Sequence, residues 1–494
     1  MPRDDQENKA NGSLTASDVK GIVIDNGNRI AAPPQRVNLE AATEIKDRIS
    51  RLNERLARYV PPRATWTPAE KALFRPVDLF RVPIDEAQAT QLKAIKHTFS
   101  RHYTLNQFYR SYCEMRGITP EHIKTYDDLE KIPLLPDVTF KQHPSGGDFA
   151  YWITVIFTGD LPRVVVKGED PTFDDIVNAF NEAGLVVALS SGTSGRHTVI
   201  PRDMKTCLTA EYAMAKIMAC MSDDLLADHS LLLVPKHTQS NLWVAKGLTY
   251  QSELYGDVLY ALNFEIGADL AHEAMTNEAR RERAPSSAKA RERIIVENAV
   301  AWFKRYDKTK DTIRVISPPF LLSRVMDELE REGYRCEFGE RGTIITGGGW
   351  KMSEDKYITP ESFRKRVEEM LGVPETRCTD MYVFTEMNGQ NHSCPEGHYL
   401  HIPHTYLKPF VLDRNLMPAG YDELGRFAFL DALAGSYPGF IVTGDEARML
   451  EHCPVCDRPG PVLEPEIHRA KGEEMRGCAE ELRRVLARMI EEGN

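Results

Sequence analysis

The chain has 494 residues, of which 42% are hydrophobic and 27% charged, a composition typical of globular proteins. Its 62 basic and 73 acidic residues give a formal net charge of −11 without any basic block, which argues against nucleic acid as a partner. No apolar run approaches the roughly 20 residues of a membrane-spanning helix, and the polar start does not resemble a signal peptide. Nine mostly scattered cysteines indicate reduced thiols and predict a cytoplasmic protein.

The first part of the chain is expected to be a flexible tail followed by helices. Residues 1–38 are polar and lack hydrophobic periodicity, so they predict a flexible tail. Residues 39–90 predict a helical extension, which begins with apolar residues at three- and four-residue steps. A second helical stretch from about 86 to 116 is rich in aromatic residues, whose helical spacing favours packing over ligand binding.

The middle of the chain, residues 91–445, alternates short apolar runs with amphipathic stretches, which indicates an α/β fold with mainly parallel sheets. Residues 395–432 predict a small β-rich part, and 446–494 a short C-terminal segment with a helix at about 479–492. The charged stretch 271–306 is either a solvated helix or a partner surface. The runs that predict strands are 164–166, 185–189, 231–234 and 315–316, and the helical stretches between them include 207–222 and 319–333.

An apolar run, Leu185–Leu189, stops at the small residues Ser190, Ser191, Gly192, Thr193, Ser194 and Gly195. This pattern predicts a buried strand that opens into a loop. Two glycines let successive amides point inward and four hydroxyls add donors, so the loop can hold a polyphosphate. The alternative is an ordinary Ser/Gly turn. A Walker A loop is excluded, because no Gly-Lys-Ser/Thr follows.

Two further strands are expected to end at glycine. Gly347, Gly348 and Gly349 allow a flat ring or a phosphate to approach the backbone, and Trp350 and Lys351 follow them. Asp445 comes after a probable strand and a glycine, a position suited to bidentate contact with ribose hydroxyls. A glycine loop and a plain turn are the respective alternatives.

The stretch from Asp380 to Asn388 contains Tyr382, Thr385 and Glu386 after a probable strand. The aromatic ring could stack on a base and the threonine could donate to a phosphate. The glutamate could hold Mg²⁺, which accepts oxygen ligands and keeps several waters. The alternative is a strand end with an exposed Thr-Glu pair.

In this order and spacing, the four stretches resemble the adenylate-forming superfamily, which makes acyl-AMP from a carboxylic acid and ATP. The resemblance implies that Ser190–Gly195 holds the phosphates, Gly347–Gly349 and Tyr382 flank the adenine, and Asp445 binds the ribose. Over about residues 95–480 the chain is more closely similar to the fatty-acid acyl-protein synthetases of bacterial bioluminescence, beside the phenylacetate–CoA ligases. That similarity rests on Ile132-Pro with Phe140-Lys141, on Ser-Gly-Thr-Ser-Gly followed by Ile200 and Asp203, and on Gly-Gly-Gly-Trp-Lys at 347–351.

The sequence departs from the superfamily pattern at two places. Arg196-His197-Thr198 stands where the phosphate loop usually continues with a lysine, so the loop is expected to rely on amides, hydroxyls and metal, with Arg196 as the candidate for replacement charge. Only 49 residues follow Asp445, whereas the mobile C-terminal domain of most members has roughly a hundred. This predicts a truncated or absent C-terminal domain, whose catalytic lysine has no counterpart here, so Lys351 and Arg469 are the candidates to supply that positive charge.

Cys478 follows Arg476-Gly477 at the expected start of the last helix, where a thiolate is favoured. The resemblance implies a C-terminal cysteine that accepts the acyl group as a thioester and hands it to a reductase or carrier protein. The alternative is a small buried hydrophobic residue.

The pair Cys453 and Cys456 has the spacing of a zinc knuckle and needs two more ligands. The best complement is Cys394 with His401, and His392 and His398 are substitutes. Related phenylacetate–CoA ligase-like proteins carry a similar set, which favours structural zinc over unpaired thiols.

The resulting hypothesis is an enzyme that activates a carboxylic acid as acyl-AMP, releases pyrophosphate and passes the acyl group to a thiol. His237, after a strand, and Trp350 are candidates for the acid pocket, although a lone histidine there is more often structural. Two rival functions remain: a ligase that joins the activated acid to CoA or a small amine, and an inactive nucleotide-binding scaffold.

Overall fold

The computed structural model describes residues 39–168, 170–191, 196–222, 227–255, 257–262, 284–350 and 357–470, with 39–43 and 284–291 described by their backbone alone. Four predicted features lie outside these residues: the tail 1–38, the loop residues Gly192–Gly195, Lys351, and Cys478 with its helix. The domain boundaries at residues 90 and 445 stay predictions. No helix of the described part has both the length and the apolarity that crossing a membrane requires.

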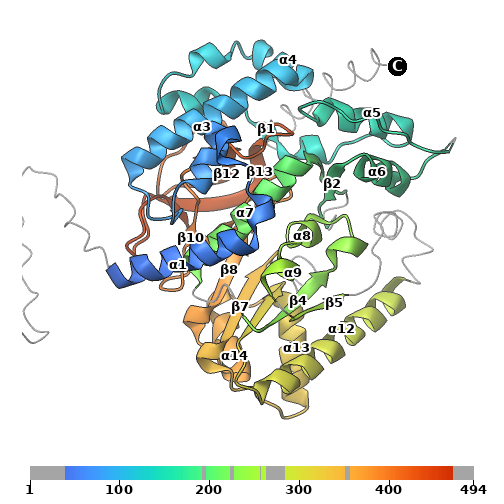
Figure 1. Cartoon of the computed structure of the whole chain (residues 1–494), viewed down its shortest axis with the longest axis vertical. Helices are drawn as coiled ribbons and strands as arrows, with labels where there is room; N and C mark the ends of the chain where they lie inside the picture. Colours follow the sequence, from blue (N-terminus) through green and yellow to red (C-terminus); the bar gives the residue numbers. More distant parts are fainter. Residues whose placement is uncertain are drawn as a thin grey trace, which may run out of the picture. The chain divides into compact units, whose positions relative to one another are not determined.

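The α/β architecture is confirmed, and its largest element is a long mixed sheet (Figure 1). Five strands at one end are parallel, in the order β5 (Asp257–Leu262), β4 (His229–Pro235), β6 (Ile313–Ser317), β7 (Gly342–Gly347) and β8 (Cys378–Tyr382). Helices α12 (Ala284–Asp307), α13 (Pro319–Arg331) and α14 (Pro360–Leu371) pack against the face that carries Val315 and Ile344. The neighbouring residues Ile316 and Ile345 point into a second core on the opposite face. Because both faces are covered, these strands read as continuous apolar runs.

The rest of the large sheet is mainly antiparallel and forms the predicted β-rich part. Beyond β8, the sheet continues through β9 (Asn391–Ser393), β10 (Leu400–His401), β14 (Val462–Leu463), β13 (Phe440–Leu450), β12 (Leu424–Asp431) and β11 (Leu407–Leu412). Two short strands also pair with β13: β1 (Leu135–Pro136), parallel to it, and β15 (His468–Arg469), antiparallel. Parallel pairing is therefore concentrated in the middle of the chain, where helices connect the strands.

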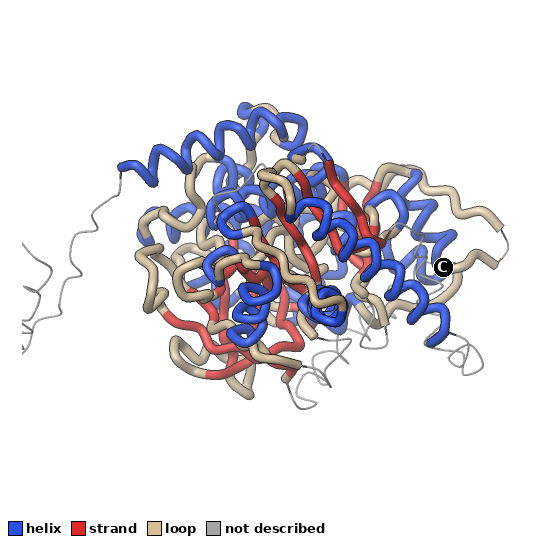
Figure 2. The backbone as a smooth tube through the Cα atoms, turned by 90° about the horizontal axis from the view of Figure 1, so that it is seen from below, coloured by secondary structure: helices blue, strands red, loops and turns tan. Residues whose placement is uncertain are grey.

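A separate two-stranded hairpin, β2 (Leu185–Leu189) and β3 (Val199–Asp203), carries the predicted phosphate loop. Helix α6 (Phe173–Glu182) precedes it and α7 (Met204–Met221) follows it, with Asp203 accepting a hydrogen bond from Thr206 N as the cap of α7. Nearly every residue of α7 is buried, as expected for a helix that is apolar on most sides. Figure 2 shows the strands with helices packed around them.

Two predictions about secondary structure are wrong. The stretch 86–116 is two helices, α3 (Ile84–Leu105) and α4 (Gln107–Met115), because Asn106 is extended, caps α4 and donates to the carbonyl oxygen of Phe157. Residues 164–166 form no strand, since they lie in a partly exposed segment without a ladder partner among the described residues. The remaining N-terminal helices are α1 (Leu39–Arg55), α2 (Pro68–Phe74) and α5 (Gly147–Ile156).

Candidate functional site

The predicted phosphate loop begins at the open end of the β2–β3 hairpin. Ser190 N donates to the Thr198 carbonyl oxygen at 3.0 Å, and Thr198 N donates to Ser190 Oγ at 2.8 Å. These two residues therefore close the base of the loop, from which exposed Ser191 and Arg196 lead outward. The strand that opens into a loop is confirmed, and phosphate binding by that loop stays a prediction.

The hairpin contacts the Thr385-Glu386 motif directly. Thr198 Oγ1 donates to Glu386 Oε1 at 3.0 Å, although the two residues are 188 positions apart. Both Thr385 and Glu386 are buried. Burial raises the pKa of Glu386 above its ordinary value, because a carboxylate loses its hydration there. The fold thus joins two of the four predicted motifs and places an acidic group at the base of the loop.

Lys141 is a cation near this group that the sequence analysis did not select. It follows the short 3-10 helix Asp137–Phe140 and pairs with Asp137 Oδ2 at 2.5 Å, with both side chains mostly buried. The positive charge of Lys141 opposes the rise in the pKa of Glu386, which Asp137 reinforces. In the sequence, Phe140-Lys141 stands out only through the family resemblance, because nothing local connects Lys141 with Glu386.

Asp445 lies inside β13, not after a strand as predicted. The strand continues through Gly444 because both β12 and β15 pair with it beyond this point, with Asp445 opposite Arg469. Asp445 Oδ2 accepts from the Tyr382 hydroxyl at 2.9 Å, and Asp445 Oδ1 lies 3.0 Å from Arg469 Nη1. Burial, followed by the charge of Asp445, raises the pKa of Tyr382 well above its ordinary value. Tyr382 and Asp445 are thus neighbours, and Arg469 is the cation beside them.

The glycine loop after β7 has the open backbone that ligand approach requires. Gly347 leaves little room for a side chain, since an added Cβ would lie 3.0 Å from Met381 Cγ and 3.2 Å from the Met381 carbonyl oxygen on β8. Gly348 and Gly349 have φ angles of +83° and +64°, which favour glycine, and an added Cβ at either would face open space. These positions leave room beside the backbone for a flat ring or a phosphate.

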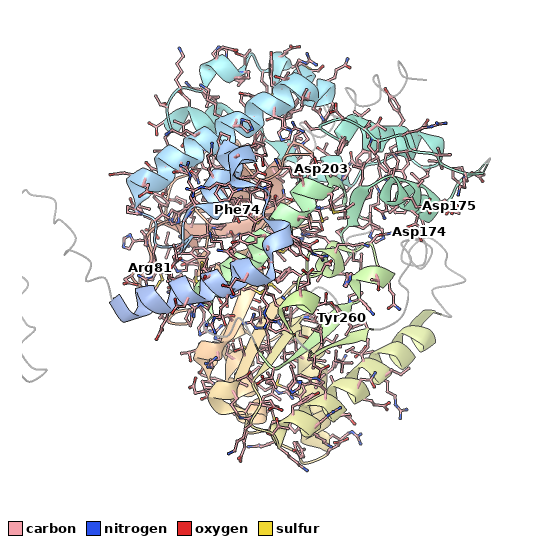
Figure 3. All side chains as sticks on the ribbon, in the orientation of Figure 1. Phe74, Arg81, Asp174, Asp175, Asp203 and Tyr260 are labelled. Atoms are coloured by element: carbon pink, nitrogen blue, oxygen red, sulfur yellow. The ribbon has the colours of Figure 1, made fainter. Side chains whose placement is uncertain are left out.

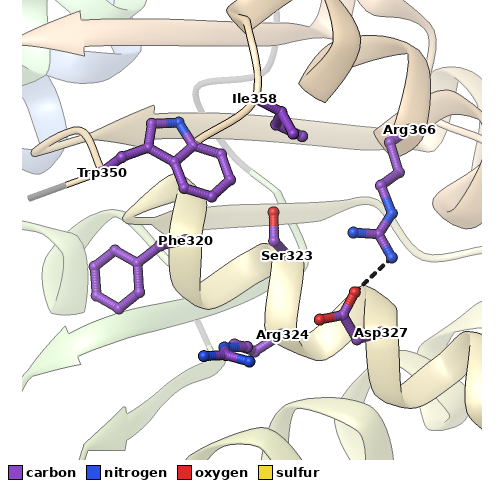
Figure 4. A pocket seen from close by; sticks show the side chains of 7 residues that line it. All are labelled: Phe320, Ser323, Arg324, Asp327, Trp350, Ile358 and Arg366. Atoms are coloured by element: carbon purple, nitrogen blue, oxygen red, sulfur yellow. Dashed lines mark hydrogen bonds and ion pairs between the residues drawn. The ribbon is translucent and has the colours of Figure 1, made fainter. Parts of the chain in front are cut away.

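The two candidates for the acid pocket lie in different surroundings. Trp350 packs against Tyr357 and Phe363 and lines a cavity of about 130 Å³ between α13 and α14 (Figure 4). His237 is half-buried after β4, with its Nδ1 3.4 Å from the hydroxyl of Tyr260 on β5. Burial lowers the pKa of His237 and thereby favours the neutral ring.

Arg202, on β3, contacts the backbone of the Thr385-Glu386 segment. No local sequence pattern marks this arginine as part of the site. Its guanidinium is fully buried and donates to the Thr385 carbonyl oxygen at 2.6 Å, to Asn388 Oδ1 at 2.9 Å and to the Tyr437 hydroxyl at 3.2 Å. The ring of Trp243 covers it, with the guanidinium carbon 3.8 Å from the ring centre. Such planar donors fit several acceptors at once, which explains an arginine at this position.

The four predicted zinc ligands come together in space. The ligand atoms of Cys394, His401, Cys453 and Cys456 all lie within 4.8 Å of one another, and most of these residues are buried. Cys394 follows β9, His401 is in β10, and the Cys-x-x-Cys pair lies between β13 and β14, so adjacent strands deliver the ligands. A hydrogen bond from Cys394 holds the pKa of the Cys456 thiol well below its ordinary value. Three sulfurs and one imidazole nitrogen are a donor set that suits tetrahedral zinc.

Comparison with known proteins gives a family. The family model described as acyl-protein synthetase, LuxE, matches residues 185–487, more than half of the chain. A long-chain-fatty-acid–luciferin-component ligase from Vibrio harveyi is 25% identical over 419 residues, which cover 83% of this chain and 92% of that protein. The ligase of the same name from Aliivibrio fischeri is 23% identical over the same shares.

A solved structure of similar fold is a 2-hydroxyisobutyryl-CoA ligase in complex with 2-HIB-AMP and CoA. Its TM-score is 0.54 at 15% identity, and the match covers 79% of this chain and 69% of that chain. At this identity the likeness supports the fold alone, in agreement with the α/β adenylate-forming fold predicted from the sequence, whereas the truncated or absent C-terminal domain stays a prediction.

Proposed function

Because this chain belongs to the LuxE family of acyl-protein synthetases, we propose that the residues gathered around Glu386 carry out the family's chemistry. The protein is an acid-activating ligase, which forms acyl-AMP with ATP and then transfers the acyl group. In the first step a carboxylate oxygen of the acid attacks the α-phosphorus and pyrophosphate leaves. In the second step a thiol sulfur attacks the acyl carbonyl carbon and AMP leaves.

The nucleotide is proposed to contact all four predicted motifs. The amides and hydroxyls of Ser190–Gly195 would hold the phosphates, Gly347–Gly349 and Tyr382 would flank the adenine, and Asp445 would bind the ribose hydroxyls. The hydrogen bond from Thr198 to Glu386 supports this arrangement best, because it brings the phosphate loop and the acidic motif together. Ribose binding would exchange the bonds that Asp445 now makes with Tyr382 and Arg469.

The positive charge that the phosphate loop lacks is proposed to come from Lys141. A pentavalent phosphorus carries more negative charge than the ground state, so a fixed cation beside it lowers the barrier. Lys141 is mostly buried and close enough to Glu386 to influence its pKa, whereas Arg196 is exposed and donates to the His143 carbonyl oxygen. Lys351 stays a further candidate from the sequence.

Glu386 is the proposed ligand for Mg²⁺. A buried carboxylate with one oxygen bonded to a hydroxyl offers the oxygen donors that this ion prefers, together with the substrate phosphates and water. The ion would neutralise the triphosphate when bound. Thr385 would donate a hydrogen bond to a phosphate oxygen from the adjacent position.

The acyl group is proposed to pass to a protein thiol, with Cys478 as the first acceptor and a reductase or carrier protein as the second. The names of the two relatives specify a long-chain fatty acid and a luciferin component as their substrates. For this chain the proposed substrate is a carboxylic acid. The cytoplasm, inferred from cysteine usage, is the proposed location.

The cluster of Cys394, His401, Cys453 and Cys456 is proposed to bind one structural Zn²⁺. The four side chains fill a tetrahedral set, which leaves no position for a reacting water, so a catalytic role is not expected. When bound, the ion would fix the loop between β13 and β14 against β9 and β10.

Acid-dependent exchange of labelled pyrophosphate into ATP tests the first step. We expect exchange with wild type and a loss of about 100-fold or more in Glu386→Gln, which keeps the size of the side chain but removes its charge. Glu361→Gln, at an exposed position of α14, is the matched control and should retain full exchange. Complete absence of exchange across a broad acid panel would favour the inactive scaffold instead.

The second step separates the proposed function from a CoA ligase. With labelled acid and ATP but no CoA, wild type should accumulate label on the protein that hydroxylamine releases, as expected for a thioester. Cys478→Ala should lose that label and keep pyrophosphate exchange. Rapid formation of acyl-CoA, with no label on the protein, would contradict transfer to a protein thiol.

A further inference from the structure

A cluster of polar side chains, of which Cys207 and Glu211 are buried and the other three half-buried, lies near Arg202, and nothing in the proposed chemistry uses it. It consists of Cys207 and Glu211 on α7, Lys246 at the end of α8 (Trp243–Lys246), His237 and Tyr260; Figure 3 labels Tyr260 on β5 and Asp203 where α7 begins. The Cys207 thiol donates to Glu211 Oε1 over 3.4 Å. The charge of Lys246 acts on the pKa of both residues, and the charge of Glu211 acts on the pKa of Tyr260. We call these five residues the polar cluster.

Two buried polar atoms at the polar cluster lack a hydrogen-bond partner among the described residues. Glu211 is 4% exposed, and its second carboxyl oxygen, Oε2, has none. Trp243, beside the cluster on α8, is also 4% exposed, and its indole Nε1 has none. Buried polar groups are usually hydrogen-bonded, so this carboxyl oxygen and this N–H are both available to a bound polar group.

Arg202 connects the surroundings of the polar cluster with the Thr385-Glu386 segment. The ring of Trp243 lies on the Arg202 guanidinium, which donates to the Thr385 carbonyl oxygen. The segment before α8 also bridges to the hairpin at Leu189, where β2 enters the phosphate loop. Trp243 and Arg202 therefore link the polar cluster to the segment that carries Glu386, beside which the carboxylate of the acid is proposed to lie.

The charge state of Glu211 selects the kind of group that fits. Burial raises the pKa of Glu211 to about 8, so the carboxyl is largely protonated at neutral pH. The cation Lys246 is close by and disfavours a second cation, such as an ammonium group. A hydroxyl, which both donates and accepts without carrying charge, matches a protonated carboxyl and an indole N–H.

We propose that the polar cluster is the specificity-determining wall of the acid site and that this enzyme activates a hydroxy acid in preference to an unsubstituted hydrocarbon chain. The inference rests on the proposed function, because it concerns the same acid. It separates this chain from relatives whose names specify long-chain fatty acids. Glu211 and Trp243 are the two residues through which the hydroxyl would be recognised.

Pyrophosphate exchange with purified full-length protein tests the proposal. The panel pairs unsubstituted acids of about 4 to 16 carbons with their 2-, 3- and ω-hydroxy counterparts. We expect kcat/KM to be about ten-fold or more higher for one hydroxy acid than for its matched partner, since polar sites reject analogues that leave their groups unpaired. Glu211→Leu should lower kcat/KM for that hydroxy acid and raise it for the unsubstituted one.

A second variant guards against misfolding of Glu211→Leu. Trp243→Phe keeps an aromatic ring over Arg202 but removes the indole N–H, and it should reduce the preference for the hydroxy acid. A parallel loss for all acids in both variants, or a preference of wild type for unsubstituted or amino acids, would overturn the proposal. Exchange with none of the acids would instead contradict the proposed function itself, so the two failures are distinguishable.

Discussion

Arg202 Nη2 donates to the carbonyl oxygen of Thr385 at 2.6 Å, inside a core where both residues are buried. This bond connects the strand that leads out of the phosphate loop with the segment that carries Glu386. The loop and the glutamate therefore keep a fixed separation, which matters because positioning supplies much of the rate in a reaction between two bound substrates.

Replacement of Arg202 should damage activity more than binding. We expect Arg202→Met to lower kcat for pyrophosphate exchange by about 10- to 100-fold with a smaller change in the KM for ATP, because a misplaced Glu386 affects the transition state most. Arg202→Lys, which keeps the charge and one donor, should recover part of kcat. Equal losses in both variants, explained by a fall in folded protein, would show that Arg202 is only structural.

The folded protein should also be less stable without this guanidinium. Loss of a hydrogen bond from a charged group costs about 1.5–3 kcal/mol, and Arg202 donates to Asn388 and Tyr437 as well as to Thr385. We expect the free energy of unfolding of Arg202→Met to fall by about 3 kcal/mol or more, measured by urea denaturation. An unchanged unfolding midpoint would contradict the hydrogen bonds described here.

The pH profile of exchange should report on Glu386 and Lys141. Only the ionised carboxylate can bind a cation, and burial raises the pKa of Glu386, so activity should rise with pH through that raised value. Lys141 favours the ionised form, so Lys141→Met should move the acid limb of the profile to higher pH. A profile that falls in height without moving would place Lys141 away from Glu386.

Lys131→Met is a suitable control for that experiment. Lys131 also pairs with an aspartate, Asp128, but its side chain is 55% exposed and lies outside the proposed site. Its profile should match that of wild type in both height and position.

Zinc content tests the cysteine–histidine cluster. Protein purified without added metal should hold about one zinc per chain, and Cys453→Ser should hold much less, because three ligands bind zinc more weakly than four. Cys113→Ala, another buried cysteine outside the cluster, is the control and should retain the metal. Substoichiometric zinc in wild type would contradict the assignment.

Chelation should reduce stability more than chemistry. Removal of zinc from wild type should lower the Tm, because the proposed ion would join the β13–β14 loop to β9 and β10. The KM for ATP should change little, since the proposed nucleotide ligands come from other segments. A large change in KM with no change in Tm would indicate a catalytic metal.

Asp445→Asn tests the ribose assignment. The amide loses the charge that faces Arg469 and accepts hydrogen bonds at only one atom, so we expect the KM for ATP to rise by about ten-fold or more with a smaller change in kcat. Tyr382→Phe removes only the hydroxyl that now bonds to Asp445 and should raise the KM less. Unaltered KM in Asp445→Asn would exclude a role in nucleotide binding.

Sequence patterns predict the α/β fold class, the strand before the predicted phosphate loop, the positions of the glycine and Thr-Glu motifs, and the four candidate zinc ligands. These features are local patterns: apolar runs, glycines and short spacings show directly in the order of residues. The break between α3 and α4 was missed because Asn106 is held by carbonyl groups about 50 residues away. The course of β13 through Asp445 was missed because it depends on pairing with β12 and β15, which the residues around Gly444 do not reveal.

The contacts among the residues of the candidate site become visible in the folded structure alone. Thr198 bonds to Glu386, Arg202 reaches Thr385, and Lys141 lies close enough to shift a pKa, although each pair is separated by more than 180 positions. A lysine or an arginine carries no local signal of its partner, since charged residues usually face solvent. Their role follows from burial, where a charge persists only if other groups of the fold compensate it.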